Sequence, residues 1–322
     1  MRLIFKSSRD KDDVIQLPSD RRVVSSFPDR EGRRSLLRVD LPDSYKDFFK
    51  FKESPFCITP DPKFFFFSRS ASEGLNHLRY GIYEGLGFTM ITGEPGTGKT
   101  VLSRYFSSKA GDDLQITRIS DPHLSNKELR LAVLENLGGS RYLQEDLSER
   151  QLTRLLHDLL IWANRQSKRV VIFLDEAQGL GFELLEGLRL LSNLETESKK
   201  LTQIVLFGQT ELEEMLREKR LRQLDQRILV RYRLLPLEPD EIQPYIQHQL
   251  AVAKADRYVE FADEAVTKIY QISRGLPRMV NVLCERAMMS TFVQNSRKIT
   301  VQSVLEGWES LNGIGILEAR NF

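Results

Sequence analysis

The eight residues Gly93–Thr100 read GEPGTGKT and decide the fold of this chain. They match the pattern G-x-x-x-x-G-K-[ST] in full. The apolar run GFTMITG before them predicts a buried strand, and Lys99–Lys109 predicts a helix. Because the pattern needs a strand before it and a helix after it, this context predicts a phosphate-binding loop.

Such a loop binds a nucleoside triphosphate through its backbone. Glycines let N–H groups turn toward phosphate oxygens without Cβ clashes, and the helix N-terminus adds partial positive charge. Lys99 is expected to reach the β- and γ-phosphates, and Thr100 to ligate Mg²⁺. We therefore predict a site for ATP and Mg²⁺ built from Gly93, Glu94, Pro95, Gly96, Thr97, Gly98, Lys99 and Thr100.

A second apolar strand, VVIFLDEA, ends in the adjacent carboxylates of Asp175 and Glu176. With a phosphate-binding loop upstream, this is the Walker B arrangement. Asp175 is predicted to orient Mg²⁺, directly or through water, and Glu176 to polarise the attacking water as general base. The pair Asp-Glu favours hydrolysis over binding alone.

Strand and helix signals alternate from Gly87 to Leu237, and helix signals follow alone after that. Near-continuous apolar strands separated by helices indicate a parallel sheet covered on both faces, so the fold class is α/β. Ser125 with Glu128, and Ser148 with Gln151, form capping-box patterns that open two of the helices. We predict an α/β core over 45–236 and a small all-α domain over 237–322, with helices near 239–255, 263–273, 277–294 and 300–310.

The N-terminal 67 residues hold two different kinds of sequence. Residues 1–44 are polar and lack any sustained period, which predicts a flexible or loosely docked extension, either an inert tail or a partner-binding arm. Residues 45–67 read YKDFFKFKESPFCITPDPKFFFF. Their prolines exclude a long helix, and four consecutive phenylalanines cannot all face water. We expect an extended strip packed on the following domain, near the nucleotide pocket.

Composition restricts the other classes of function. The 322 residues carry 47 Lys and Arg against 45 Asp and Glu, so any charge signal is local. The two cysteines, Cys57 and Cys284, form no CxxC pair, and the four histidines form no zinc motif. No apolar run approaches the roughly 18–20 residues of a membrane helix, and no signal peptide is evident. The expected location is cytoplasmic.

Three further features surround the predicted site. Gln209 ends the strand LTQIVLFGQ, where it either contacts the γ-phosphate or its water, or is an ordinary polar strand end. Arg278 follows Gly275 and Pro277 at a helix start, where it either folds over the phosphates or lies on the surface.

The stretch Arg217–Arg233 holds seven cations in seventeen residues. A solvated or interfacial face is the first interpretation and contact with duplex DNA the second, with Tyr232 as the one aromatic residue suited to base stacking.

The motifs GEPGTGKT, LDEA, FGQTEL, LRQLDQRI and GLPRMVN occur in the order typical of AAA+ ATPases. More narrowly, Tyr45–Leu311 resembles the ExeA or general secretion pathway protein A group, in its N-terminal aromatic signature, its strand end LFGQTEL and its lid motif GLPRMVNVLCERAM. Transposition ATPases similar to TnsC and TniB share the same core.

The resemblance implies ATP hydrolysis at subunit interfaces of a homo-oligomer, either a ring or a filament, and coupling of nucleotide state to an unidentified protein partner. It implies that Gln209 is sensor 1, that Arg278 is sensor 2, and that Arg227 in DQRI is the arginine finger, with Arg222 as the second candidate. A role in secretion, pilus or export systems, regulation of transposition on duplex DNA, and a non-catalytic nucleotide-gated scaffold remain the three alternatives.

Overall fold

A computed structural model describes residues 45–121, 124–139, 147–195 and 200–312, all within one compact unit that begins at Asp43. Five parallel strands form its sheet in the order β2-β3-β4-β1-β5. The strands are β1 (Phe88–Gly93), β2 (Leu114–Ile119), β3 (Arg169–Leu174), β4 (Thr202–Phe207) and β5 (Ile228–Leu234). The sheet confirms the predicted fold class.

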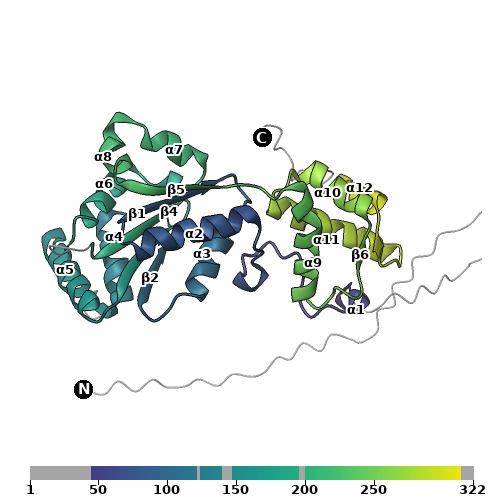
Figure 1. The fold of residues 1–322 in the computed structure, drawn as a ribbon, viewed down its shortest axis with the longest axis horizontal. Helices are drawn as coiled ribbons and strands as arrows, with labels where there is room; N and C mark the ends of the chain where they lie inside the picture. Colours follow the sequence, from purple (N-terminus) through teal and green to yellow (C-terminus); the bar gives the residue numbers. More distant parts are fainter. Residues whose placement is uncertain (1–44, 122–123, 140–146, 196–199, 313–322) are drawn as a thin grey trace, which may run out of the picture. The chain divides into compact units, whose positions relative to one another are not determined.

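Helices cover both faces of the sheet, as the apolar strands require (Figure 1). One face packs against α2 (Arg69–Tyr83) and α3 (Lys99–Ser108). The other face packs against α4 (Asn126–Leu134), α5 (Glu149–Arg165), α6 (Phe182–Leu191), α7 (Thr210–Leu216) and α8 (Arg222–Asp225). Because side chains alternate along a strand, Val171 and Phe173 of β3 face the first group, whereas Ile172 faces the second.

Both predicted capping boxes are present. At α4 the Ser125 side chain accepts a hydrogen bond from the Glu128 backbone N–H, and the Glu128 side chain accepts one from the Ser125 backbone N–H. Ser148 and Gln151 make the same pair of bonds at α5. The sequence missed α7 and α8, which are only seven and four residues long. A five-residue π-helical turn, Glu135–Gly139, and two single 3-10 turns, Lys219–Leu221 and Pro239–Glu241, extend the neighbouring helices.

The C-terminal part consists of α9 (Ile242–Val252), α10 (Asp263–Ser273), α11 (Pro277–Val293) and α12 (Val301–Asn312). They enclose a second hydrophobic core, separate from those beside the five-stranded sheet. The prediction of helices alone is wrong in one detail, because β6 (Glu260–Phe261) pairs with β7 (Lys298–Ile299). The predicted boundary at 236 stays a prediction.

The aromatic segment joins both cores. It contains α1 (Tyr45–Phe49) and a 3-10 turn, Pro62–Phe64, and no long helix. The expectation that the segment packs on the following domain is wrong for its first half, because the buried side chains of Phe48, Phe49, Phe51 and Phe56 lie in the core of the C-terminal helices. These aromatic rings are large apolar surfaces, and the core of α9–α12 is where they are removed from water.

The four phenylalanines 64–67 alternate between the two cores. Phe64 and Phe66 pack against the C-terminal core, and Phe66 lies 5.5 Å from Tyr245 between ring centroids. Phe65 stacks on Tyr105 of α3 at 4.3 Å, and Phe67 meets the same ring edge-on. This two-residue period is that of extended chain. We call Cys57–Phe67 the strap.

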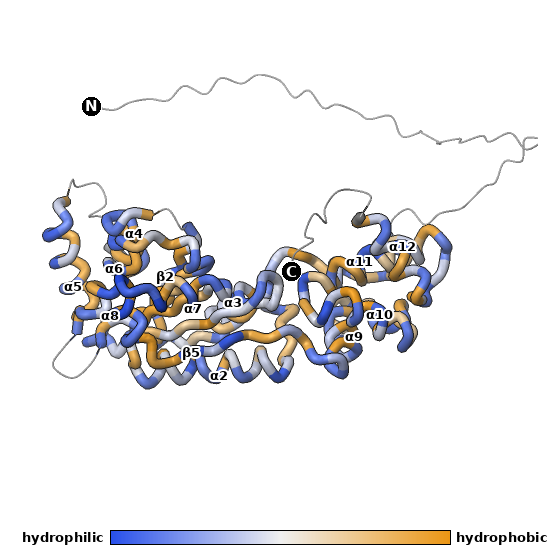
Figure 2. Tube along the Cα trace, turned by 90° about the horizontal axis from the view of Figure 1, so that it is seen from above, coloured by the Kyte–Doolittle hydropathy of each residue, from blue (hydrophilic) through white to orange (hydrophobic). Residues whose placement is uncertain are grey.

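The distribution of hydrophilic and hydrophobic residues differs between the helices. The tube in Figure 2 is hydrophilic around α8 and carries hydrophobic residues along α11. Among the described residues, no helix combines the length and the low charge that crossing a bilayer would need.

Candidate nucleotide-binding site

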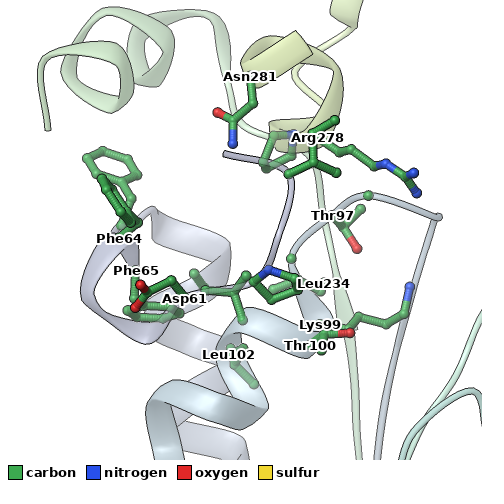
Figure 3. A pocket seen from close by; sticks show the side chains of 18 of the residues that line it. Asp61, Phe64, Phe65, Thr97, Lys99, Thr100, Leu102, Leu234, Arg278 and Asn281 are labelled. Carbon is green, nitrogen blue, oxygen red and sulfur yellow. The ribbon is translucent and has the colours of Figure 1, made fainter. Parts of the chain in front are cut away.

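A cavity of about 450 Å³ lies where the P-loop, the strap and α11 meet (Figure 3). The P-loop residues Pro95–Thr100 line it, together with Glu176 and Gln209 from the strand ends and Arg278 from α11. The cavity lies outside the carboxyl ends of β1, β3 and β4, which is where ligands bind in parallel α/β sheets. Its size suits a nucleotide-sized ligand.

The Lys99 side chain binds back onto the phosphate-binding loop (P-loop, Gly93–Thr100). Its Nζ donates to the carbonyl oxygen of Gly93 at 2.7 Å and to that of Glu94 at 2.9 Å. The side chain is buried, and burial lowers the pKa of its ammonium group, although the carboxylate of Glu176 opposes this. The cation therefore lies at the base of the cavity, where phosphate oxygens can replace the carbonyl oxygens.

Asp175 and Arg118 form a partly buried pair at the end of β3. Asp175 Oδ2 lies 3.6 Å from Arg118 Nη1, and Arg118 also donates to the hydroxyls of Ser103 and Ser107 on α3, each at 3.0 Å. Burial raises the pKa of Asp175, and the charge of Arg118 opposes the rise. Within the described residues, buried Asp175 Oδ1 has no hydrogen-bond partner. An orphaned carboxylate oxygen fits Mg²⁺, which takes oxygen ligands, and Thr100 in the first turn of α3 supplies another.

Glu176 and Gln209 meet at the mouth of the cavity. Gln209 Nε2 donates to Glu176 Oε2 at 3.3 Å. Gln178, from the 3-10 turn Ala177–Gly179, donates to the same oxygen at 2.7 Å and accepts from the Gln209 backbone N–H at 3.0 Å. The other carboxylate oxygen, Oε1, makes no hydrogen bond to any residue that the structure describes.

Arg278 links α11 to the P-loop. Its backbone N–H donates to the carbonyl oxygen of Gly96 at 3.2 Å. Gly96 has φ +88°, and a Cβ there would lie 3.0 Å from the Arg278 Cβ, so this close approach depends on glycine. In Figure 3 the Arg278 guanidinium and the Lys99 ammonium extend in the same direction, with the loop running between them.

The strap and the C-terminal helices form the opposite wall of the cavity. Asn281 Nδ2 donates to the Cys57 carbonyl at 3.4 Å, and Gln249 Nε2 donates to the Phe64 carbonyl at 3.1 Å. Arg104 of α3 holds the Pro60 carbonyl at 2.6 Å. The part of the sequence prediction that put this segment near the pocket is confirmed.

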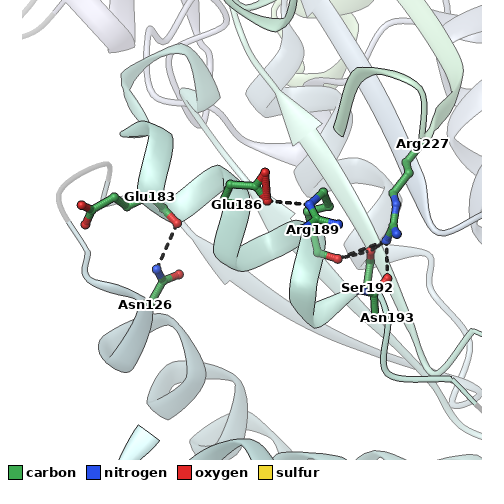
Figure 4. A network of polar contacts seen from close by, with 7 residues as sticks. All are labelled: Asn126, Glu183, Glu186, Arg189, Ser192, Asn193 and Arg227. Carbon is green, nitrogen blue, oxygen red and sulfur yellow. Dashed lines mark hydrogen bonds and ion pairs between the residues drawn. The ribbon is translucent and has the colours of Figure 1, made fainter. Parts of the chain in front are cut away.

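Arg227 lies away from the cavity, at the C-terminal end of α6 (Figure 4). Its Nη1 donates to Ser192 Oγ at 3.0 Å and to the Arg189 carbonyl at 3.2 Å, and it also bonds Asn193 Oδ1. The negative end of the α6 dipole stabilises a cation at this position. Arg222, by contrast, is exposed, and its side chain makes no hydrogen bond or ion pair within the described part of the chain.

The side chains of four of the seven cations in 217–233 are engaged within the protomer. Three arginines form ion pairs: Arg220 with Glu218, Arg231 with Asp225, and Arg233 with Glu213. Arg227 is engaged at α6, as above. Arg217, Lys219 and Arg222 are exposed, and their side chains make no hydrogen bond or ion pair to any described residue.

Tyr232 is engaged as well. Its ring stacks on His77 with centroids 4.8 Å apart, and its hydroxyl lies within hydrogen-bond distance of Ser70 and Glu73 on α2. A stacked, half-buried ring of this kind is not open to a nucleic-acid base.

The structure thus brings together Pro95–Thr100, Glu176, Gln209 and Arg278 around one cavity, with Asp175 beneath it. It does not bring Arg227 there. Sequence reasoning missed Gln178, whose signal was its place two residues after Glu176, and Arg118, which no motif marks.

Comparison with known proteins identifies what this chain is similar to. Residues 82–216 match the family model described as AAA domain. General secretion pathway protein A of Aeromonas hydrophila is 40% identical over 255 residues, which are 79% of this chain and 46% of that protein. The chain therefore spans about half the length of this relative.

Solved structures share the fold. Cdc6p from Pyrobaculum aerophilum has a TM-score of 0.59 at 16% identity, covering 82% of this chain and 70% of that one. The RuvB Holliday junction branch migration motor of Thermotoga maritima has a TM-score of 0.51 at 21% identity, covering 76% and 69%. The AAA domain match, the similarity to protein A and the parallel P-loop sheet agree: the chain belongs to the AAA+ family.

Proposed function

We propose that this chain binds ATP with Mg²⁺ in the cavity and hydrolyses it at interfaces between copies of itself, coupling nucleotide state to a partner assembly. The observation that carries the proposal is the convergence of Lys99, Glu176, Gln209 and Arg278 on one cavity above Asp175. The similarity to general secretion pathway protein A supports an AAA+ ATPase associated with secretion, pilus or export systems.

Each residue has a distinct proposed role. Lys99 exchanges its carbonyl partners for β- and γ-phosphate oxygens, and backbone N–H groups of Gly96–Thr100 hold the phosphate chain. Glu176 accepts a proton from the attacking water through Oε1, while Gln209 senses the γ-phosphate. Mg²⁺, held by Thr100 and Asp175, would neutralise charge on the phosphate oxygens when bound.

Arg278 carries nucleotide state to the C-terminal helices. Its backbone bond to Gly96 ties α11 to the loop that surrounds the phosphates, and its guanidinium extends over that loop. We propose that residues 45–236 are the ATPase core and that 237–322 are a lid, with Phe48–Phe56 packed in the lid core. Residues 1–44 lie outside the described residues.

A guanidinium from a neighbouring copy would complete the site. Arginines supplied in trans raise the rate by roughly 10³–10⁵ in related phosphoryl-transfer systems. Arg227 holds the end of α6 in the protomer and would have to leave it, whereas the Arg222 side chain is exposed and makes no hydrogen bond or ion pair in the described region. Both arginines therefore remain candidates, and the geometry of the single protomer favours Arg222 more than the sequence does.

The first experiment tests the base. Glu176→Gln should bind ATP with unchanged affinity and lower kcat at least about 100-fold, within the range of general-base catalysis. Glu214→Gln, a change of the same kind at an exposed position of α7, is the matched control. Normal turnover by Glu176→Gln would remove Glu176 from the reaction.

The second experiment identifies the arginine. Inactive Lys99→Ala subunits are mixed with Arg227→Ala or with Arg222→Ala subunits. Activity reappears only where an intact P-loop faces an intact arginine, so rescue occurs in the mixture that carries the true finger variant. Absence of rescue in both mixtures would contradict hydrolysis between copies.

Duplex DNA is the second candidate partner. The side chains of three exposed cations, Arg217, Lys219 and Arg222, make no hydrogen bond or ion pair in the described part of the chain and lie within six residues of one another. In a transposition regulator of the TnsC and TniB type, they would bind phosphates. ATPase stimulation by DNA should then fall as salt rises, and each alanine variant should reduce the salt slope by about 0.9. Turnover indifferent to DNA would leave the protein-partner proposal alone.

A further inference from the structure

Gln178 lies between the two polar groups that face the mouth of the cavity. Its Nε2 donates to Glu176 Oε2 at 2.7 Å, and its Oε1 accepts from the backbone N–H of Gln209 at 3.0 Å. One half-buried side chain therefore spans the turn after β3 and the turn after β4.

An amide satisfies both contacts because it carries a donor and an acceptor. A carboxylate accepts hydrogen bonds and donates none when ionised, and an aliphatic side chain does neither. The reverse orientation of the amide would set its NH₂ against the Gln209 N–H and its oxygen against the Glu176 carboxylate. The two contacts therefore fix the orientation of the Gln178 amide.

Glu176 needs such support because little else holds it. Its side chain is exposed, and its backbone is in the left-handed region, with φ 53° and ψ 42°. The hydrogen bonds of its carboxylate to described residues all reach Oε2, from Gln178 and from Gln209. A long carboxylate without these bonds would lose its preferred direction to rotamer freedom.

We propose that Gln178 is a positioning residue that holds the Glu176 carboxylate and the Gln209 turn in one frame, leaving Glu176 Oε1 free to accept a proton from water. The inference deepens the proposed function and rests on it. The base and the γ-phosphate sensor are then set together, so that a shift of the Gln209 turn on phosphate binding moves Glu176 as well.

The test compares Gln178→Leu and Gln178→Glu in the full chain. Gln178→Leu removes both contacts, and we expect kcat to fall about 10- to 30-fold, the rate equivalent of freeing one rotamer-rich side chain. Affinity for a non-hydrolysable ATP analogue should stay within about twofold, because Gln178 does not line the cavity.

Gln178→Glu separates positioning from simple support. It still accepts from the Gln209 N–H, but it loses the donor to Glu176 and places a second carboxylate beside it. A kcat as low as that of Gln178→Leu supports the proposal, and a wild-type kcat overturns it. The control is Gln302→Leu, which removes a comparable amide bond, to Glu306 at 2.9 Å, on exposed α12.

A double-mutant comparison tests whether Gln178 acts through Glu176. In a Glu176→Gln background, Gln178→Leu should lower kcat no further, because the group it positions is gone. An additive loss overturns the proposal. If wild-type protein turns over ATP, Glu176→Gln stalls and both Gln178 variants keep full activity, this inference alone fails. If Glu176→Gln turns over normally, the proposed function and the inference fail together.

Discussion

Replacing Gly275 with alanine should loosen the attachment of the C-terminal helices. Gly275 has φ +78°, and its carbonyl accepts from the Leu237 N–H at 2.8 Å. A Cβ at this position would lie 2.1 Å from the Leu237 carbonyl oxygen and 3.1 Å from its C and N atoms. These are all backbone atoms, so no change of rotamer relieves the clash.

The expected cost has two parts. Alanine in the left-handed region costs about 1–2 kcal/mol. Displacing Leu237 breaks the hydrogen bond with Gly275, which contributes about 1 kcal/mol. We therefore expect Gly275→Ala to lower the free energy of unfolding by about 2–3 kcal/mol.

Gly138→Ala separates the two parts. Gly138 has a similar φ, +81°, but no atom lies within 4 Å of its ideal Cβ position. Its substitution should therefore cost only the conformational part, about 1–2 kcal/mol.

Urea unfolding measures both variants through the two tryptophans. Trp308 packs against the C-terminal core and reports on Gly275→Ala in a Trp162→Phe background, and Trp162 on α5 reports on Gly138→Ala in a Trp308→Phe background. If Gly275→Ala costs no more than Gly138→Ala, the contact with Leu237 does not bear on stability and the reasoning is refuted.

Three other predictions concern the core, the site and the pH dependence. Phe49→Ala should cost about 3–5 kcal/mol in urea unfolding, because its ring is fully buried, whereas exposed Phe67→Ala should cost less than about 1 kcal/mol. Arg118→Ala should cost about 2–4 kcal/mol by leaving the Asp175 carboxylate without its cation, and adding Asp175→Asn should recover part of this; an Arg118→Ala protein as stable as wild type would contradict the pairing. Burial lowers the pKa of His248, so the unfolded chain binds more protons, and stability should fall as pH drops through the ordinary histidine value of about 6.5. Thermal melts between pH 8 and 5 should show this loss reduced in His248→Gln.

The strands and long helices could be predicted because local signals and tertiary packing agree. The run VVIFL is apolar throughout and FTMITG is mostly apolar, which favours a sheet covered on both faces, and the capping boxes at Ser125 and Ser148 mark helix starts chemically. The packing of Phe48–Phe56 could not be predicted, because hydrophobicity requires burial without naming the core that provides it.

The site was predicted as far as motifs mark it. GEPGTGKT and LDEA locate the P-loop and the carboxylates, because their chemistry fixes both residue type and spacing. Arg118 and Gln178 carry no such mark, since their positions follow from side-chain geometry on neighbouring strands and turns. The pairing of Arg233 with Glu213 also depends on the fold, because charges distant in sequence lie together only after folding.

The chain passes between the sheet core and the C-terminal core twice, at Phe64–Phe67 and at Leu234–Leu237. Two passages define a line, so a rocking movement about that line leaves both intact, whereas a twist across it stretches one or the other. Under the proposed function, nucleotide turnover would move the two cores along a single angular coordinate. A protease that severs only one passage should leave both pieces attached, yet free them from that axis.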